Sequence, residues 1–338
     1  MVDLVDSLVQ FNGHRGKAAI TIDGSPLPAE VNLIRVRLTD KRGLEPDTLT
    51  LELDDINDTL PLPTKKAVIT LQLGWDQSRL IDKGSFTVTN VQHSGPPDKI
   101  VITAQSADLL SGLKQPRKKS WANPTLGQIV NDIADLHSLK AIVGDALKKT
   151  QLAQIEQNDE SDVNLLTRLS QDYDAIAQIK SGYLLFMPKG KAVSVDGQPL
   201  DEVVVARAKG DSHTFAQSAE SESITGAQAY WHDIDGAKRR TVKVGENGNR
   251  RHLKNTYPNE AEAIAAANAK WQTIKRGVHT FTATLARGMP EMIVESPVRL
   301  QAYKSEIGAI KWVGQEIIHT LDDSGLITEL SLEEIVSV

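Results

Sequence analysis

Hydrophobic and polar residues alternate over much of the first hundred positions, which is the pattern of strands buried on one face. In residues 67–75, AVITLQLGW, the side chains of Ile69, Leu71 and Leu73 share one face, and Thr70 falls on the other. The same alternation recurs at residues 33–40, 48–55 and 100–104. Turns rich in Gly, Pro, Asn and Asp separate these segments. The pattern predicts an all-β unit, a barrel or a sandwich.

The period changes in the middle of the chain. Residues 123–139, NPTLGQIVNDIADLHSL, carry apolar residues at helical spacing, with Asn123 as the expected N-cap and Pro124 as the first helical residue. A second helix is predicted within residues 158–174. Strand-like pieces accompany the helices at residues 153–157 and 175–188. Residues 113–200 are therefore predicted to form a small α/β module set into a β protein.

Strand-like alternation returns in the last third of the chain. It is found at residues 201–208, 225–233, 279–286, 296–303 and 327–332. Asn247 and Gly248 lie between two strand-like arms in residues 239–254, which predicts a β-hairpin. One helix interrupts the strands over residues 259–277, with Gly277 as its expected C-cap.

The two β regions resemble each other. Residues 84–105 and residues 308–332 each consist of a strand ending in His, a turn that contains Gly, and a second alternating strand. A further strand-like segment precedes each copy, at residues 67–75 and 296–303. Because the spacing differs between the copies, the pattern leaves internal duplication and coincidence equally open.

The composition is that of a soluble globular protein with two or three domains. Of 338 residues, 40% are hydrophobic, 24% are charged and 4% are aromatic, so the core must be mostly aliphatic. The absence of cysteine excludes disulfides and cysteine-ligated metals and suits a reducing cytoplasm. A net charge of −6 gives no overall basic footprint for nucleic acid. Neither a signal peptide nor a membrane anchor is expected, because acids stand where a signal peptide carries Lys or Arg.

Five carboxylates lie close together in residues 158–174. A glycosidase needs two carboxylates that face each other across a cleft, and a calcium loop needs acids at fixed spacing. Three of these acids instead flank Ser161, a good N-cap, where negative charge favours the helix dipole. The other two are expected in solvent near the end of the helix. We interpret the segment as a helix start in a scaffold, with the five acids being Asp159, Glu160, Asp162, Asp172 and Asp174.

Other chemical motifs are absent from the sequence. It contains no nucleophile elbow, no phosphate-binding loop and no dinucleotide fingerprint. The one compact His/Asp group, residues 232–235, is explained by a strand end, and His93 and His319 are interpreted as structural. We therefore expect no catalytic residue, no cofactor and no metal ligand, and the protein is not expected to be an enzyme.

Two basic groups are the candidate contacts with partner proteins or with a central lumen, and solvated surface charge is the alternative interpretation. They consist of Lys114, Arg117, Lys118, Lys119, Arg239, Arg240, Arg250 and Arg251. No nucleic-acid reading motif accompanies them, so sequence-specific nucleic-acid binding is not expected.

Several segments, taken in order and with their spacing, carry a family resemblance. They are DGSPLP at 23–28, LPLP at 60–63, LGWD at 73–76, HSGPPD at 93–98, SADLL at 106–110, the block at 158–190 and AYWHD at 229–233. Together, over residues 18–332, the chain resembles the phage late control gene D family, whose members are baseplate hub proteins of contractile-tailed phages. The central block is also similar to the hub part of the valine-glycine-repeat spike proteins of type VI secretion. The first 13 residues depart from the family pattern.

The resemblance implies an α+β, mainly β fold in which two tube-like β-barrel domains flank the inserted α/β module. With the strand patterns, the domains are expected at residues 1–112, 113–200 and 201–338. It also implies a homotrimer that joins a sixfold tail tube to a threefold central spike, so the expected partners are the spike, the tail tube protein and, as a further candidate, the tape measure protein. The expected location is the virion tail baseplate, after assembly in the bacterial cytoplasm.

Two alternative functions stay open on the sequence. The first is a tail-associated enzyme that degrades peptidoglycan, which would need a cleft presenting Glu160 together with Asp172 or Asp174. The second is a spike-hub protein of a type VI secretion system.

Overall fold

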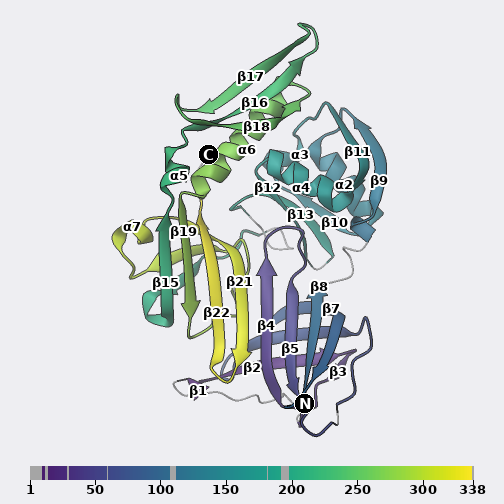
Figure 1. The fold of residues 1–338 in the computed structure, drawn as a ribbon, viewed down its shortest axis with the longest axis vertical. Coiled ribbons are helices and arrows are strands. Elements are labelled where there is room, and N and C mark those ends of the chain that lie inside the picture. Colours follow the sequence, from purple (N-terminus) through teal and green to yellow (C-terminus); the bar gives the residue numbers. More distant parts are fainter. Residues whose placement is uncertain are drawn as a thin grey trace.

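Strands predominate in the molecule and helices are few, which confirms the expected mainly β fold class (Figure 1). The computed structural model describes residues 10–11, 14–28, 30–58, 60–106, 112–180, 182–191 and 198–336. Two β units lie side by side, and a small α/β module and a helix-backed sheet lie at the end away from β2 and β3 (Figure 1). Among the described residues, no helix has the length and apolarity needed to span a bilayer.

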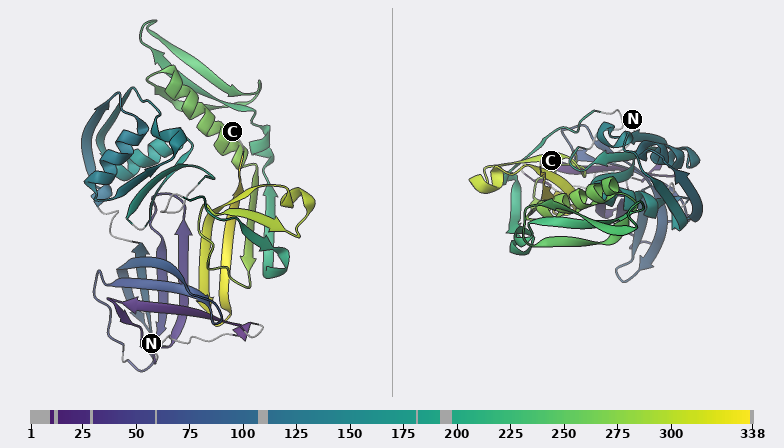
Figure 2. Two further views of the ribbon diagram at one scale, coloured as in Figure 1. Left: turned by 180° about the vertical axis from the view of Figure 1, so that it is seen from behind. Right: turned by 90° about the horizontal axis from the view of Figure 1, so that it is seen from above.

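The first unit consists of β2 to β8, with the short β1 (Gln10–Phe11) paired to β2. Its strands are β2 (His14–Ile22), β3 (Ser25–Pro26), β4 (Leu33–Lys41), β5 (Thr48–Asp54), β6 (Val68–Trp75), β7 (Ile81–Ser94) and β8 (Lys99–Ser106). The long strand β7 pairs with β6 through its first half and with β8 through its second half. The unit therefore folds into two layers, and β2 and β6 run across the back of β4 and β5 (Figure 2). The alternating apolar residues fill the space between the layers.

The second unit consists of β14, β15 and β19 to β22. Its elements are β14 (Val203–Ala206), η1 (Arg207–Lys209), β15 (Gly210–Gln217), β19 (His279–Leu285), β20 (Pro297–Gln301), α7 (Ser305–Gly308), β21 (Trp312–Asp322) and β22 (Gly325–Glu334). The fully buried indole of Trp312 lies at the centre of this unit's core and donates its N–H to the Ile307 carbonyl at 3.1 Å. Strands β4 and β21 pair, so both units belong to one 14-stranded sheet.

The two units repeat the same strand pairing, which confirms the internal duplication. The first unit runs in the order β6-β7-β8-β5-β4, and the second in the order β20-β21-β22-β19-β15, with every neighbouring pair antiparallel. The β7–β8 ladder shifts register between Val88 and Asn90, and the β21–β22 ladder shifts at the equivalent place, between Gly314 and Glu316. The copies differ at their ends, since β2 pairs antiparallel with β6 whereas β14 pairs parallel with β20.

The central module carries two sheets and two long helices. Its elements are β9 (Pro116–Ala122), α2 (Leu126–Leu136), β10 (Lys140–Val143), α3 (Asp145–Lys148), β11 (Gln154–Ser161), α4 (Asp162–Asp172), β12 (Ala175–Lys180) and β13 (Tyr183–Pro188). Helix α4 begins after Ser161, whose side chain accepts from the Asn164 N–H, as predicted. The N-cap of α2 was predicted wrongly: it is Thr125, which forms a reciprocal capping box with Gln128. That box satisfies two free backbone donors, which Asn123 does not do.

An outer insertion between β15 and β19 forms a sheet of its own. It contains α5 (Ala219–Ser223), β16 (Gly226–Asp233), β17 (Lys238–Gly245), β18 (Arg250–Tyr257) and α6 (Glu260–Arg276), and Gly277 caps α6 as predicted. The predicted hairpin is wrong, because β16 lies between β17 and β18 and pairs with both. The Asn247-Gly248 turn instead crosses the start of β16, where Thr225 N–H donates to the Asn249 carbonyl at 2.8 Å. The division into three domains at residues 112 and 200 stays a prediction.

Candidate assembly interface

The two units meet in a seam where β4 pairs antiparallel with β21. The pairing runs from Lys41 opposite Glu316 to Val36 opposite Leu321. Inter-strand hydrogen bonds perpendicular to the strands therefore cross from one unit to the other. The β4–β21 pairing therefore shows how one unit attaches to another within this chain.

Ion pairs cross the seam on its solvent-facing side. Arg35 Nε lies 3.3 Å from Asp322 Oδ2, and Arg37 Nη1 lies 3.2 Å from Glu329 Oε1. Arg37 also donates to Thr320 Oγ1 at 3.3 Å. Because both arginines are more than 40% exposed, each pair contributes at most about 1 kcal/mol. The main-chain ladder and the buried side of the seam must carry the attachment.

A buried Lys–His contact lies on the other side of the seam. His319 is fully buried, and its Nε2 lies 3.2 Å from Lys83 Nζ while its Nδ1 lies 3.0 Å from Thr328 Oγ1. Lys83 also donates to the Met292 carbonyl at 3.3 Å. Burial, and then the charge of Lys83, lowers the pKa of His319 to about 3, so the ring is neutral near pH 7. Its Nε2 also lies 3.1 Å from the Met292 carbonyl oxygen. Burial lowers the pKa of Lys83 to about 8.

A second buried group joins the seam to the central module. Lys180 Nζ lies 3.0 Å from Asp40 Oδ1 and 2.5 Å from Asp47 Oδ2, and Asp40 Oδ2 also accepts from the Val294 N–H at 3.0 Å. Burial raises the pKa of Asp47 to about 6, and the nearby charge of Asp40 adds to the effect. Burial opposes ionisation of Asp40 as well, but the charge of Lys180 and the Val294 N–H outweigh it and lower the Asp40 pKa.

A third set of charges connects all four parts of the chain. Arg42, which follows β4, contacts Glu295 at 2.5 Å and also pairs with Glu333 of β22. Glu333 lies 3.7 Å from Arg276 at the end of α6, and Arg276 holds Asp174 of the module through both guanidinium nitrogens, one of them at 2.8 Å. The first unit, the second unit, the module and the outer insertion therefore share one network of charges.

Two strand edges stay open in the part of the chain that the structure describes. Strand β15 pairs only with β19, and most of its residues are exposed. On β7, pairing with β6 ends at Thr87, so residues 89–94 have β8 on one side and no described strand on the other. Open edges of this kind pair readily with another chain.

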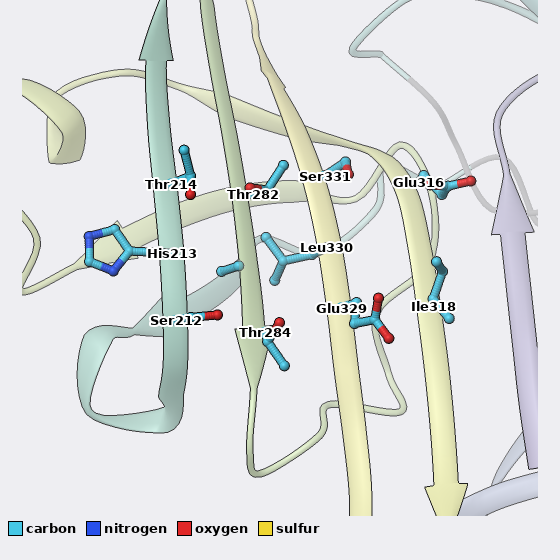
Figure 3. A pocket seen from close by; sticks show the side chains of 11 residues that line it. Ser212, His213, Thr214, Thr282, Thr284, Glu316, Ile318, Glu329, Leu330 and Ser331 are labelled. Carbon is cyan, nitrogen blue, oxygen red and sulfur yellow. The ribbon is translucent and has the colours of Figure 1, made fainter. Parts of the chain in front are cut away.

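The face of the second unit next to the open edge of β15 is polar and hollow. A shallow depression of about 170 Å³ lies over β15, β19, β22 and β21 (Figure 3). Small hydroxyl side chains from three strands line it: Ser212, Thr214, Thr282, Thr284 and Ser331. Glu316 and Glu329 are the acids at its border with the seam. The lining of the depression is therefore mostly polar.

The first basic group lies on or beside β9 and is largely neutralised. Arg117 lies 3.3 Å from Asp162, Lys118 lies 3.4 Å from Asp159, and Lys119 lies 2.9 Å from Asp132. Lys114 is exposed at the start of the same segment. Two acids of the 158–174 block, Asp159 and Asp162, are therefore ion-pair partners of the first basic group. The sequence patterns gave no sign of this pairing.

The second basic group is divided between the two edge strands of the outer insertion. Arg239 of β17 stacks over Tyr230 at 3.8 Å, and Arg240 lies 2.6 Å from Asp233. Arg250 and Arg251 lie on β18, across β16 from the first pair. The structure does not bring the four arginines into one patch.

The expectation that Asp172 and Asp174 lie in solvent is wrong. Asp172 accepts from the Tyr257 hydroxyl at 3.0 Å, and burial raises its pKa. Asp174 is bound by Arg276, as described above. Both acids hold the outer insertion against the module, because the helix end that carries them packs against α6. Asp162 is 1% exposed and is bound by His137 at 2.7 Å.

Sequence patterns missed the buried charges of the seam, although one of them left a signal. Asp40 continues the buried face of Val36 and Leu38, so period two alone places a carboxylate in the core. Lys83 and Lys180 left no comparable signal. His319 is buried and structural, as expected, whereas His93 is exposed on β7 with its Nε2 3.5 Å from Asp55. His93, Asp55 and Asp58 bring three potential ligand atoms within 4.8 Å of one another.

Comparison with known proteins identifies the family. No protein-family profile matches the chain. It is 36% identical to the "Probable baseplate hub protein" of Escherichia phage 186, with 89% of this chain and 88% of that protein covered. The equivalent protein of Escherichia phage P2 is 34% identical over the same shares of both chains. The chain belongs to the phage baseplate hub protein family. It is thus a hub protein of a contractile-tailed phage lineage, and the resemblance noted in the sequence is confirmed.

Solved structures share the fold of this hub protein across almost its whole length. A 43 kDa tail protein of prophage MuSo2 from Shewanella oneidensis matches with a TM-score of 0.67 and 14% identity, covering 94% of this chain and 98% of that one. A component of the type VI secretion system of E. coli matches with a TM-score of 0.62 and 9% identity, covering 94% and 77%. At these identities the likeness shows a common fold.

The half-buried Lys180 should be important for stability. Lys180→Met leaves Asp40 and Asp47 buried without their cation, and breaking a buried pair in this way costs about 3–5 kcal/mol. We expect the urea midpoint to fall sharply, whereas Lys270→Met on the exposed face of α6 should barely change it. An unchanged midpoint for the Lys180 variant would show that the two acids do not depend on this lysine.

His319 should make the protein acid-sensitive. Its pKa in the folded chain, about 3, lies below its ordinary value of 6.5, so the unfolded state binds more protons between these values. Stability should therefore fall as pH drops below 6.5, by roughly 1.4 kcal/mol per unit from this group. We expect His319→Gln to flatten the plot of unfolding free energy against pH between 6.5 and 4, relative to the parent chain. His93→Gln, at the equivalent strand position, is the control, and equal slopes for the parent and His319→Gln would contradict the assignment.

Proposed function

We propose that this hub protein acts as a structural adaptor, in which three copies close a ring that joins a sixfold tail tube to a threefold central spike. The observation that carries the proposal is the duplicated strand pairing. Three chains with two equivalent units each would present six similar binding surfaces to the tube. The same three chains would present threefold symmetry to the spike. Sheet edges that have no partner strand within the described part of the chain give the ring its means of closure.

The proposal assigns the protein a mechanical task without bond chemistry. The acids that a peptidoglycan-cleaving site would need are engaged elsewhere: Glu160 pairs with Arg168 at 2.8 Å, Asp172 binds Tyr257 and Asp174 binds Arg276. A general acid and a nucleophile must instead face each other across a cleft. The protein would be located in the baseplate of the virion tail, after assembly in the bacterial cytoplasm.

The mass in solution tests the ring. Size-exclusion chromatography with light scattering should give a particle of three times 36.9 kDa, because the open edges of one chain would pair with those of its neighbours. Dilution in high salt should leave it intact, since the expected contact is made of main-chain bonds and apolar area. A particle that stays at the mass of one chain, alone and with its spike protein added, would contradict the proposal.

The basic residues of the outer insertion test the candidate partner contacts. If β18 meets the tape measure protein or another acidic partner, replacing Arg250 and Arg251 by Glu should reduce infectivity about tenfold or more while particles still assemble. The matched control replaces Arg239 and Arg240 by Glu on the opposite edge strand. Normal titres for the β18 variant, measured by plaque assay on purified particles, would remove these residues from the contact.

A further inference from the structure

The internal seam gives a template for how one chain attaches to the next. Because the two units repeat the same ladders, each residue of the first unit has an equivalent in the second. The pairings β5–β8 and β19–β22 coincide residue for residue, from Thr48 with Gln105 and Thr280 with Glu333 onward. The equivalence therefore rests on hydrogen-bonded registers and does not depend on sequence similarity.

Register shifts fix the equivalence on the two strands that matter. The β4–β5 ladder shifts between Leu33 and Arg35, and the β15–β19 ladder shifts between Gly210 and Ser212. Arg35 is thus equivalent to Ser212, and β15 is the second copy of β4. In the same way, the shifts after Val88 and after Gly314 show that β7 of the first unit is equivalent to β21 of the second.

These two copies are the strands with open edges. Within the chain, β4 pairs with β21 just beyond the point where β20 leaves β21, at Val313. On β7 the corresponding stretch begins just beyond Thr87, where β6 leaves it, and its outer edge has no partner among the described residues. Strand β15 likewise has no described partner on the side where β4 meets β21. Among the described residues, the two strand edges equivalent to those of the seam are therefore both unpaired.

We propose that β15 of one copy pairs antiparallel with β7 of the next, in the register of the internal β4–β21 seam; this rests on the ring proposed above and specifies its contact. Carried over residue by residue, the seam places Gln217 opposite Val91, Ala216 opposite Gln92, Phe215 opposite His93 and Thr214 opposite Ser94. The internal counterparts are Asp40 with Ile317, Thr39 with Ile318, Leu38 with His319 and Arg37 with Thr320.

The side chains suit this register. On the solvent-facing side it joins Ala216 with Gln92 and Thr214 with Ser94, and no like charges meet. On the core-facing side Phe215, stacked on His279 at 5.6 Å and edge-on to Trp312 at 6.3 Å, meets His93. A half-exposed aromatic ring at the end of a packed aromatic cluster gains buried area when the next copy covers it. Shifting the register by one residue would place Phe215 opposite Gln92 or Ser94, whose side chains point to the other face of β7, so it would lose its contact with His93.

The contact is head-to-tail, because a chain offers β15 at one end and β7 at the other. Contacts of this type close into a ring when the rotation between units divides a full turn, and otherwise extend into a filament. The contact between chains repeats the one inside each chain. Around the ring, each unit would therefore pair with its neighbour through the same strand contact, alternately within one chain and between two chains.

Cysteine pairs can test this register directly, since the chain has no cysteine of its own. The variant Gln92→Cys/Ala216→Cys places one thiol on each strand, both at exposed positions. Directly opposed residues lie within the Cα distance of about 4.4–6.8 Å that a disulfide needs. Mild oxidation should therefore yield covalent dimers and trimers on a non-reducing gel, with dimers also formed when the two single variants are mixed.

Two further variants serve as controls. Gln92→Cys/Ser212→Cys moves one thiol four residues along the same face, about 13 Å away, and should give roughly tenfold less covalent product because disulfides need close, aligned Cβ atoms. Thr39→Cys/Ile318→Cys reproduces the pair inside the seam and should lose its free thiols on oxidation without gaining mass. Light scattering under reducing conditions measures the mass of each variant.

The outcomes separate this contact from the ring itself. Cross-linking of the Ala216 pair above the shifted control supports the register. A particle of three chains that cross-links the two pairs equally, or neither, overturns the register and leaves the adaptor role in place. A chain that stays single under reducing conditions overturns both.

Discussion

An edge strand exposes backbone donors and acceptors that must bind either water or another strand, and this requirement dominates the architecture of the chain. The chain carries two copies of the same curved sheet, so it carries two copies of each edge. One pair of edges, on β4 and β21, is joined within the molecule. The other pair, on β15 and β7, stays open among the described residues. The chain thus forms one such contact internally and leaves the equivalent edges available for a contact with another chain.

The buried charges of the seam fix how the two units fit together. Lys83 comes from the first unit and His319 from the second, while Lys180 of the module holds two acids of the first unit. Asp40 and His319 would be left buried without these partners if the strands slipped, and such groups are costly in a low-dielectric interior. The ion pairs on the solvent side are too exposed to perform this role. We attribute the precision of the seam to the polar groups beneath it, and its strength to apolar packing such as Leu321 and Leu326 in the core of the first unit.

The charge network from Glu295 to Asp174 attaches the module and the outer insertion to the two β units. Arg42 and Arg276 each contact acids from different parts of the chain, and Arg276 is only 6% exposed. Movement of one part would separate several pairs at once. The β units, the module and the insertion are therefore held together by one set of charge pairs.

Sequence patterns predicted the elements that depend on neighbours a few residues apart. Period two marked the strands of both units, and Ser161 marked the start of α4. The His-turn-strand echo raised the duplication as an alternative that the strand pairing then decided. Where a local signal met a distant partner, prediction failed. Asn247-Gly248 favours a hairpin, but the apolar strand β16 inserts between its arms to pack Ala227 and Ala229 under α6. Asp172 and Asp174 have the sequence context of solvent-exposed acids, yet Tyr257 and Arg276 bury them.

The sequence by itself determined which segments are strands or helices and which face of each strand is apolar, and it left the duplication of the two halves as an open alternative. These properties follow from side-chain spacing along a few residues of chain. The tertiary structure alone decided which edges are joined and which stay open, and which charges meet in the seam. Asp40 and Lys180, for example, are separated by 140 positions. Partners that far apart are selected by the fit of whole units, and no local pattern records that fit.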